Sequence, residues 1–213
     1  MKADVLVIGA GAVGCSIARE LTRYNLNVIV VDKNPDVGGL ASKSNSAIIH
    51  TGYDASPGTL ESELVVAANP MYDKIASELD VPFSRVGAIL PAITDEQFEL
   101  LPTLKEKAFK NRVYDIEYLT KEKVLEMEPN MTPEVRGALY IPRESIIDPF
   151  LLVVGYAENA VANGAQFLLN TEVTGIEIKE GRITGANTTK GFIEAKFIVN
   201  AAGLFCDQIA SFV

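Results

Sequence analysis

Three glycines near the start of the chain, Gly9, Gly11 and Gly14, are spaced as G-x-G-x-x-G between an apolar run and a stretch of helical periodicity. In that setting the first glycine makes a tight turn and the second lets a pyrophosphate approach the backbone. The third lets the helix pack closely on the strand. Backbone N–H groups at the start of this helix, which includes Ala12 and Val13, are expected to bind the phosphates.

An acidic residue ends the next apolar run, residues 27–32. The carboxylate of Asp32 can accept hydrogen bonds from both hydroxyls of a ribose, and it would repel a 2′-phosphate. The adjacent Lys33 is included among the expected cofactor contacts. Together with the glycines, these residues predict a dinucleotide site. The motif alone fits NAD as well as FAD, so an NAD-linked dehydrogenase is an alternative at this point.

The only histidine of the chain lies in a long loop, residues 35–58, that is rich in Gly, Ser, Asn and Pro. Small residues let the backbone approach a large planar ligand, and polar side chains bind its oxygens. Ser42, Asn45 and Ser46 are therefore candidate cofactor contacts, although an ordinary surface loop has a similar composition. His50 suits acid–base chemistry near neutral pH. It is the candidate catalytic residue, with cofactor positioning and a purely structural role as alternatives.

The elements that must position these residues have an α/β pattern. A strand, the glycine turn, a helix and a second strand follow one another within about thirty residues, which is a βαβ unit with a right-handed crossover. Another helix is expected after Asp148, which caps it, with Pro149 in its first turn. Residues 172–179, 182–189 and 192–199 predict three strands of a β-meander.

Apolar residues also predict a long helix over residues 60–79. The helix is expected to bend at Pro70, because proline lacks a backbone N–H donor. Six apolar residues lie at helical spacing, and we expect the face that they form to lie in the core: Leu60, Leu64, Ala68, Met71, Ile75 and Leu79.

The middle of the chain, residues 81–145, predicts an α+β insertion. Short strands alternate there with helices that begin at the capping residues Thr94 and Thr120. Three arginines of this region either bind an anionic group or make ordinary structural contacts: Arg85, Arg136 and Arg143.

Composition and charge exclude several classes of protein. The chain has 213 residues, of which 48% are hydrophobic and 22% charged, as in a globular protein. A net charge of −9 without a basic run argues against binding to nucleic acid. The chain has no apolar run of about eighteen residues and no recognisable signal peptide, so we expect no transmembrane segment and a cytoplasmic location. Cys15 and Cys206 are expected to be buried small hydrophobes, and no Cys-His-Asp cluster indicates a metal.

Nearly the whole sequence resembles the FAD-dependent family that contains glycerol-3-phosphate dehydrogenases, L-2-hydroxyglutarate oxidases and D-amino-acid oxidases. The segment from Gly9 to Asp32 is similar to its FAD fingerprint, and residues 42–52 are similar to its flavin loop of serines followed by Ile-His-x-Gly. The resemblance implies FAD as the cofactor. It adds further expected FAD contacts from the flavin loop, from a strand near the adenine and from a strand-to-helix turn: Ile49, Val173, Ala201, Ala202 and Gly203.

The resemblance also divides the predicted α/β fold into domains. Residues 1–80 and 146–213 are expected to form a noncontiguous FAD-binding domain, Rossmann-like, with a parallel sheet and the β-meander. Residues 81–145 are expected to interrupt it as a partial α+β substrate domain.

The activity that the resemblance implies is hydride transfer from a small anionic hydroxy compound to flavin, while a base removes the hydroxyl proton. Residues 53–60 are more similar to the glycerol-3-phosphate dehydrogenase branch, and L-2-hydroxyglutarate is the alternative substrate. An electron acceptor or electron-transfer subunit is implied as partner, through which the chain would lie peripherally at a membrane.

Family members are longer, and residues 204–213 form an apolar ending without a helix cap. We therefore expect a truncated chain that oxidises substrate poorly by itself and self-associates or pairs with a completing chain. A non-catalytic FAD-binding fragment or subunit is a further alternative.

Overall fold

The structure, a computed structural model, describes all residues, 1–213, and these group into two compact units. The first unit contains Met1–Ser46, Leu79–Val81 and Asp148–Val213, and the second contains Ala47–Glu78 and Pro82–Ile147. The predicted FAD-binding domain included residues 47–78, whereas in the structure these residues group with the middle of the chain. The assignment of FAD binding to residues 1–80 and 146–213 stays a prediction.

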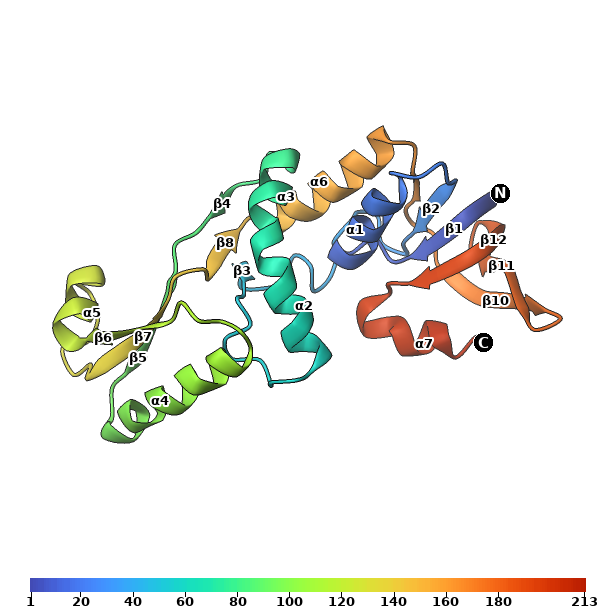
Figure 1. Cartoon of the computed structure of the whole chain (residues 1–213). Helices are drawn as coiled ribbons and strands as arrows, with labels where there is room; N and C mark the ends of the chain where they lie inside the picture. Colours follow the sequence, from blue (N-terminus) through green and yellow to red (C-terminus); the bar gives the residue numbers. More distant parts are fainter. The chain divides into compact units, whose positions relative to one another are not determined.

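The first unit is built on a six-stranded sheet in the order β10-β11-β12-β1-β2-β9 (Figure 1). Its strands are β1 (Lys2–Ile8), β2 (Val28–Val31), β9 (Gln166–Leu168), β10 (Val173–Lys179), β11 (Arg182–Thr188) and β12 (Gly191–Asn200). β1 pairs in parallel with β2 and with β12, and β2 pairs in parallel with β9. β10, β11 and β12 form an antiparallel meander. The predicted α/β fold with a parallel sheet and a β-meander is confirmed.

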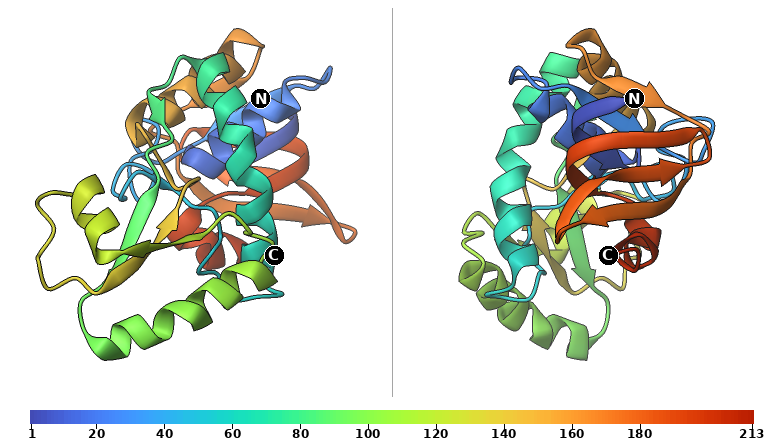
Figure 2. Two further views of the ribbon diagram at one scale, coloured as in Figure 1. Left: turned by 60° about the vertical axis from the view of Figure 1, so that its left-hand side comes forward. Right: turned by 90° about the vertical axis from the view of Figure 1, so that its right-hand side faces the viewer.

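Two long helices of this unit, α1 (Ala12–Leu21) and α6 (Pro149–Ala162), lie side by side (Figures 1 and 2). As predicted, Asp148 begins α6, because its side chain accepts hydrogen bonds from the backbone N–H groups of Phe150 and Leu151. The chain ends in a short turn, η2 (Gly203–Phe205), and α7 (Cys206–Ala210).

Side chains on both faces of the central strands are buried in the core of the first unit. Leu6 and Val7 of β1 and Val28 and Val30 of β2 are at most 1% exposed, although adjacent side chains of a strand point to opposite faces. Burial on both faces is typical of parallel strands, and it explains why these segments are apolar runs without alternation. Ile209 of α7 packs with Leu6 on one of the two faces.

The second unit contains two small antiparallel sheets, with the orders β3-β8-β4 and β5-β7-β6. The strands are β3 (Ile48–Ile49), β4 (Phe83–Ser84), β5 (Ala88–Ala92), β6 (Glu117–Thr120), β7 (Gly137–Ile141) and β8 (Ser145–Ile147). Its helices are α2 (Leu60–Ala68), η1 (Asn69–Met71), α3 (Tyr72–Leu79), α4 (Asp95–Lys110) and α5 (Lys121–Met127). The pairing of β3 with β8 is the reason that the segment before α2 belongs to this unit.

The predicted helix over residues 60–79 is present and is interrupted at Pro70, where η1 separates α2 from α3. The predicted burial of its apolar face is wrong for Leu60, Leu64 and Met71, which are 69%, 58% and 57% exposed. Ala68, Ile75 and Leu79 of the same face are half-buried. α2 is apolar on more than one side, and it packs on the core of its unit through Val66 instead. Periodicity marks an apolar stripe but does not show which stripe has a partner.

The two cysteines differ in their environments. Cys15 of α1 is buried, its thiol donates to the Ala10 carbonyl at 3.3 Å, and burial raises its pKa to about 12, with a smaller contribution from the charge of Asp32. Cys206 is exposed at the start of α7, so its predicted burial is wrong. The two residues before it, Leu204 and Phe205, are apolar, but the position itself faces solvent.

A first prediction concerns Gly14, where α1 packs against the end of β1. A Cβ at this position would lie 1.8 Å from the carbonyl oxygen of Gly9, so Gly14→Ala must displace the backbone. We expect this variant to lose about 3 kcal/mol or more of unfolding free energy in urea denaturation. Gly155→Ala in α6 is the matched control, because the same gain in helix propensity meets a nearest contact of 3.2 Å. Equal stabilities of the two variants would contradict the close packing.

Candidate functional site

The glycine turn connects the carboxyl end of β1 to the start of α1, and its three glycines have different roles. Gly9 has a positive φ of 108°, and a Cβ there would lie 2.4 Å from the carbonyl oxygen of Ala201. Gly9 and Gly14 are thus required by the packing of the protein itself. Gly11 has an ordinary φ of −79°, and its only near neighbour is the Ser42 hydroxyl, 3.1 Å from an ideal Cβ. The space beside Gly11 is therefore not needed by the fold and is suited to a ligand.

The first turn of α1 has backbone N–H groups that are suited to an anion. The early N–H groups of a helix, here those of Ala12 and Val13, have no partner within the helix and carry a partial positive charge. The Ala12 N–H donates to the Ser42 hydroxyl at 2.9 Å, which brings the loop beyond β2 to the glycine turn. Ser42 thus lies at the predicted phosphate site.

Asp32 stands directly after β2 and is bonded to the glycine turn. Its Oδ2 accepts from the Ala10 N–H at 2.7 Å, and its Oδ1 accepts from the backbone and side-chain nitrogens of Asn34 at 2.8 and 2.9 Å. These bonds fix the carboxylate beside the turn. Because a carboxylate has about four acceptor positions, Asp32 can still accept from a ribose hydroxyl.

The remaining loop residues of the first unit are more exposed. The Asn45 side chain donates to the carbonyls of Ala41 and Ser42, which closes the loop on itself, and Ser46 is exposed beside it. The Lys33 ammonium lies 3.5 Å from the centre of the Phe205 ring. These contacts place Lys33 against the turn that follows β12.

Segments from the end of the chain complete this cluster. The backbone N–H of Thr171 donates to the Asp32 carbonyl at 2.8 Å, which brings the start of β10 and the buried Val173 beside the loop after β2. The Ala201 N–H donates to the Ile8 carbonyl at 2.8 Å, so Ala201 and Ala202 lie against Gly9. The structure therefore brings together most of the predicted cofactor residues of the first unit, with Asn45 and Ser46 in the exposed part of the loop: Gly9, Gly11, Ala12, Val13, Gly14, Asp32, Lys33, Ser42, Val173, Ala201, Ala202 and Gly203.

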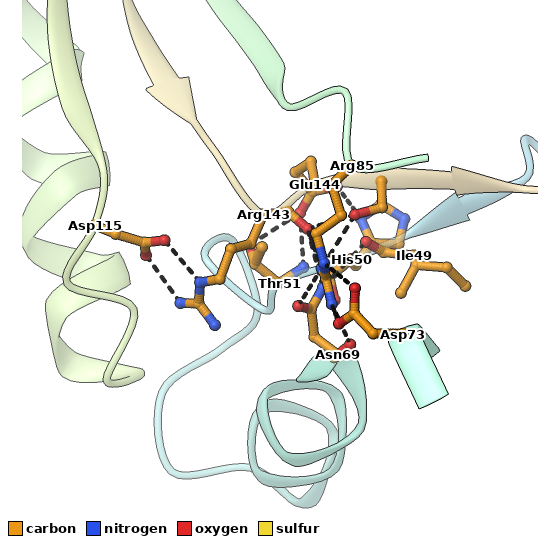
Figure 3. Close-up of polar contacts among 10 residues, drawn as sticks. Ile49, His50, Thr51, Asn69, Asp73, Arg85, Asp115, Arg143 and Glu144 are labelled. Carbon is orange, nitrogen blue, oxygen red and sulfur yellow. Dashed lines mark hydrogen bonds and ion pairs between the residues drawn. The ribbon is translucent and has the colours of Figure 1, made fainter. Parts of the chain in front are cut away.

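Ile49 and His50 belong to the second unit, where β3 leads directly into the histidine (Figure 3). The His50 ring is 52% exposed, and its Nδ1 lies 3.3 Å from Oε2 of the buried Glu144. The other oxygen of Glu144 accepts from the backbone N–H and the hydroxyl of Thr51, at 2.7 and 2.9 Å. The pairing of β3 with β8 causes this contact, because Glu144 directly precedes β8.

A buried amide holds the same loop from its other side. The Asn69 side chain is 0% exposed, and its amide nitrogen donates to the carbonyls of Ile49 and His50 at 3.3 and 3.0 Å. It also donates to the Arg143 carbonyl at 3.2 Å, while its oxygen accepts from Arg85 at 2.9 Å. Sequence analysis missed Asn69 and Glu144, because neither belongs to a recognisable motif.

The three candidate arginines all have acidic partners. Arg143 forms a two-pronged pair with Asp115 at 2.7 and 2.8 Å, and Arg85 forms a second such pair with Asp73. Hydrogen bonds from these guanidinium groups lower the pKa of each aspartate. Arg136 pairs with Asp95 at 3.1 Å. These contacts favour the structural interpretation of the three arginines over anion binding.

The sheet and its glycine turn define an α/β protein of the dinucleotide-binding class. The model of the FAD-dependent oxidoreductase (DAO) family matches residues 4–213, so the chain belongs to this family. The predicted family is confirmed, as is FAD as the cofactor of that family.

Individual proteins that are similar to this chain support the family assignment. The chain is 47% identical to glycerol 3-phosphate dehydrogenase of Caloramator mitchellensis over 99% of this chain and 44% of the relative. It is 27% identical to L-2-hydroxyglutarate dehydrogenase of Indibacter alkaliphilus over 99% of this chain and 52% of the relative. The structure of FAD-bound, dithionite-reduced L-α-glycerophosphate oxidase from Mycoplasma pneumoniae matches with a TM-score of 0.92 and 30% identity, over 100% of this chain and 57% of that one.

The chain thus spans about half the length of the relatives it matches. None of its helices combines the length and apolar character that crossing a membrane requires.

A second prediction concerns the pair of Asp115 and Arg143. Because Arg143 lowers the pKa of Asp115, the pair stabilises the fold above the ordinary titration range of aspartate, and this stability is lost as the pH falls through the lowered pKa. We expect Asp115→Asn to lower the unfolding free energy by about 1 kcal/mol at pH 7, a small value because the pair is partly exposed.

The difference in Tm between wild type and Asp115→Asn should shrink as the pH falls below about 4. Asp54→Asn is the control, because Asp54 is exposed and forms no ion pair. A difference that stays constant down to about pH 2 would show that the charge of Asp115 does not matter.

Proposed function

We propose that this chain binds FAD through its first unit. We propose further that it belongs to an oxidoreductase that removes a hydride from a small hydroxy compound, and the favoured substrate is glycerol 3-phosphate. The observation that carries the proposal is the free space beside Gly11 at the N-terminus of α1, with Asp32 bonded to the same turn. A side chain at position 11 would fill this space.

The residues around the turn suit the parts of FAD. The N–H groups of Ala12 and Val13, with the Ser42 hydroxyl, would hold the pyrophosphate beside Gly11. Asp32 would accept from the ribose. The backbone near Val173 would hold the adenine, and further contacts of the first unit would come from residues of the loop and of the two flanking turns: Gly9, Gly14, Lys33, Asn45, Ser46, Ala201, Ala202 and Gly203. A contact of FAD with Ile49 of the second unit stays a prediction.

FAD, when bound, supplies the acceptor of the hydride from the carbinol carbon. The chain must then remove the proton of the substrate hydroxyl, and His50 is the proposed base. Its ring is half-exposed, so a substrate can reach it, while Glu144 lies against the ring and Asn69 binds the backbone carbonyl of His50. Oxidation of the substrate thus separates into a hydride that leaves carbon and a proton that passes to His50.

Similarity to the Caloramator glycerol 3-phosphate dehydrogenase, at 47% identity, favours glycerol 3-phosphate as the substrate. The alternative is L-2-hydroxyglutarate, because an L-2-hydroxyglutarate dehydrogenase also matches nearly the whole chain, at 27% identity. Both compounds are small, anionic and oxidised at a hydroxyl-bearing carbon. An electron acceptor or electron-transfer subunit and a cytoplasmic location are parts of the same proposal.

A specific observation supports a second candidate, a non-catalytic FAD-binding chain that another chain completes. The sequence covers 44% of the Caloramator relative, and the sheet β5-β7-β6 of the second unit has only three strands, with two unpaired edges. Unpaired edges and exposed apolar side chains such as Leu60 and Leu64 favour association.

A third prediction tests the cofactor site. Gly11→Val should abolish FAD binding, because the valine fills the space beside the helix N-terminus while displacing only the Ser42 side chain. The measurement is the flavin absorbance retained by purified protein after gel filtration. Gly175→Val in β10 is the matched control, since no atom lies within 4 Å of its Cβ position. Retention of FAD by the Gly11 variant at the wild-type level would contradict the assigned site.

A fourth prediction concerns turnover. With an artificial electron acceptor, FAD-loaded monomer of this chain should oxidise glycerol 3-phosphate slowly and L-2-hydroxyglutarate more slowly still. Gly11→Val provides the blank. A preference for L-2-hydroxyglutarate would reverse the substrate assignment, and rapid turnover by a confirmed monomer would show that this half of the relatives' length carries a complete active site.

A further inference from the structure

The histidine of the second unit has one charged partner, Glu144, whose position is unusual for a carboxylate. Glu144 is 4% exposed, and none of the ion pairs of the chain joins it to a lysine or arginine, since Arg85 and Arg143 pair with Asp73 and Asp115. A buried carboxylate without a cationic partner is costly unless hydrogen bonds satisfy it. Its hydrogen-bond donors are the N–H and hydroxyl of Thr51, and the His50 ring lies beside its other oxygen, so the carboxylate is specifically arranged around this loop.

The two oxygens of Glu144 have separate partners. Oε1 accepts from the Thr51 backbone N–H at 2.7 Å and from its hydroxyl at 2.9 Å, and Oε2 faces Nδ1 of His50 at 3.3 Å. An ionised carboxylate has no proton to donate. A proton on Nδ1 is therefore favoured, because the lone pair of an unprotonated Nδ1 would face the negative carboxylate at 3.3 Å.

We propose that Glu144 is a positioning residue that fixes neutral His50 in the Nδ1–H tautomer and so makes Nε2 the basic nitrogen. The inference rests on the proposed function, in which His50 is the base. A neutral imidazole carries one N–H, and the hydrogen bond of one nitrogen decides the state of the other. None of the hydrogen bonds of the structure uses Nε2, and the ring is 52% exposed, so Nε2 is free to meet a substrate hydroxyl.

The proton transfer is then complete within the chain. The substrate O–H bond breaks, an Nε2–H bond forms, and the imidazolium that results faces the negative charge of Glu144. FAD, when bound, would accept the hydride from the carbinol carbon, as in the proposed function. Thr51 keeps the carboxylate oriented throughout, because both of its donors bind the same oxygen.

Glu144→Gln tests this assignment without a change of shape. The Thr51 N–H can only donate, so the amide oxygen must take the place of Oε1. The amide NH₂ group then faces Nδ1 and needs an acceptor there. His50 must move its proton to Nε2, and the tautomer is inverted although both hydrogen-bonding partners remain.

The measurement is ¹⁵N NMR of the imidazole nitrogens at about pH 9, where a histidine is neutral. The chain has one histidine, so a single set of signals reports on His50. We expect Nδ1–H in the wild type and Nε2–H in Glu144→Gln. Thr51→Val is the matched control and should keep Nδ1–H, because its backbone N–H still binds Oε1.

Nε2–H in the wild type would overturn the proposal. This measurement needs no variant, so it is decisive even if Glu144→Gln fails to fold. Nδ1–H in a folded Glu144→Gln variant would overturn it as well. The tautomer does not depend on turnover, so the proposed function fails separately: if the tautomer inverts as expected and His50→Gln keeps the wild-type rate of oxidation, Glu144 positions the ring but His50 is not the base.

Discussion

The parallel pairing of β1 with β12 is the contact on which the first unit depends. It joins residues almost two hundred positions apart, from Lys2 with Glu194 to Ile8 with Asn200, and thereby brings both ends of the chain into one sheet. The pairing also sets Ala201 against Gly9 so closely that no side chain fits between them. The glycine turn is thus shaped jointly by the first and last segments of the chain.

A smaller pairing has the same role in the second unit. β3 and β8 share only two residue pairs, yet they bring the loop around His50 to Glu144 and within reach of Asn69. Strands this short contribute little stability, so the buried side chains complete the arrangement. The buried side chains of Thr51, Asn69 and Glu144 all have partners, as burial of an unsatisfied amide or carboxylate would be costly.

The distribution of charge separates structural from functional groups. Arg85 and Arg143 lie near His50, but their guanidinium groups form ion pairs with Asp73 and Asp115 (Figure 3). His50 and the N-terminal turn of α1 are different, because each presents polar atoms that the fold does not use. Groups of this second kind are the ones with which a cofactor or substrate can interact.

The sequence by itself determined the α/β fold, the caps of α6 and α4, and the glycine turn with Asp32, because each depends on neighbouring residues or on a short motif with a local mechanical reason. Only the tertiary structure decided that Glu144 and Asn69 hold His50, that the arginines are paired, and that Leu60 and Leu64 are exposed. These features depend on which distant segments meet. Side-chain type and periodicity describe what a residue can contact, whereas strand pairing decides what it does contact.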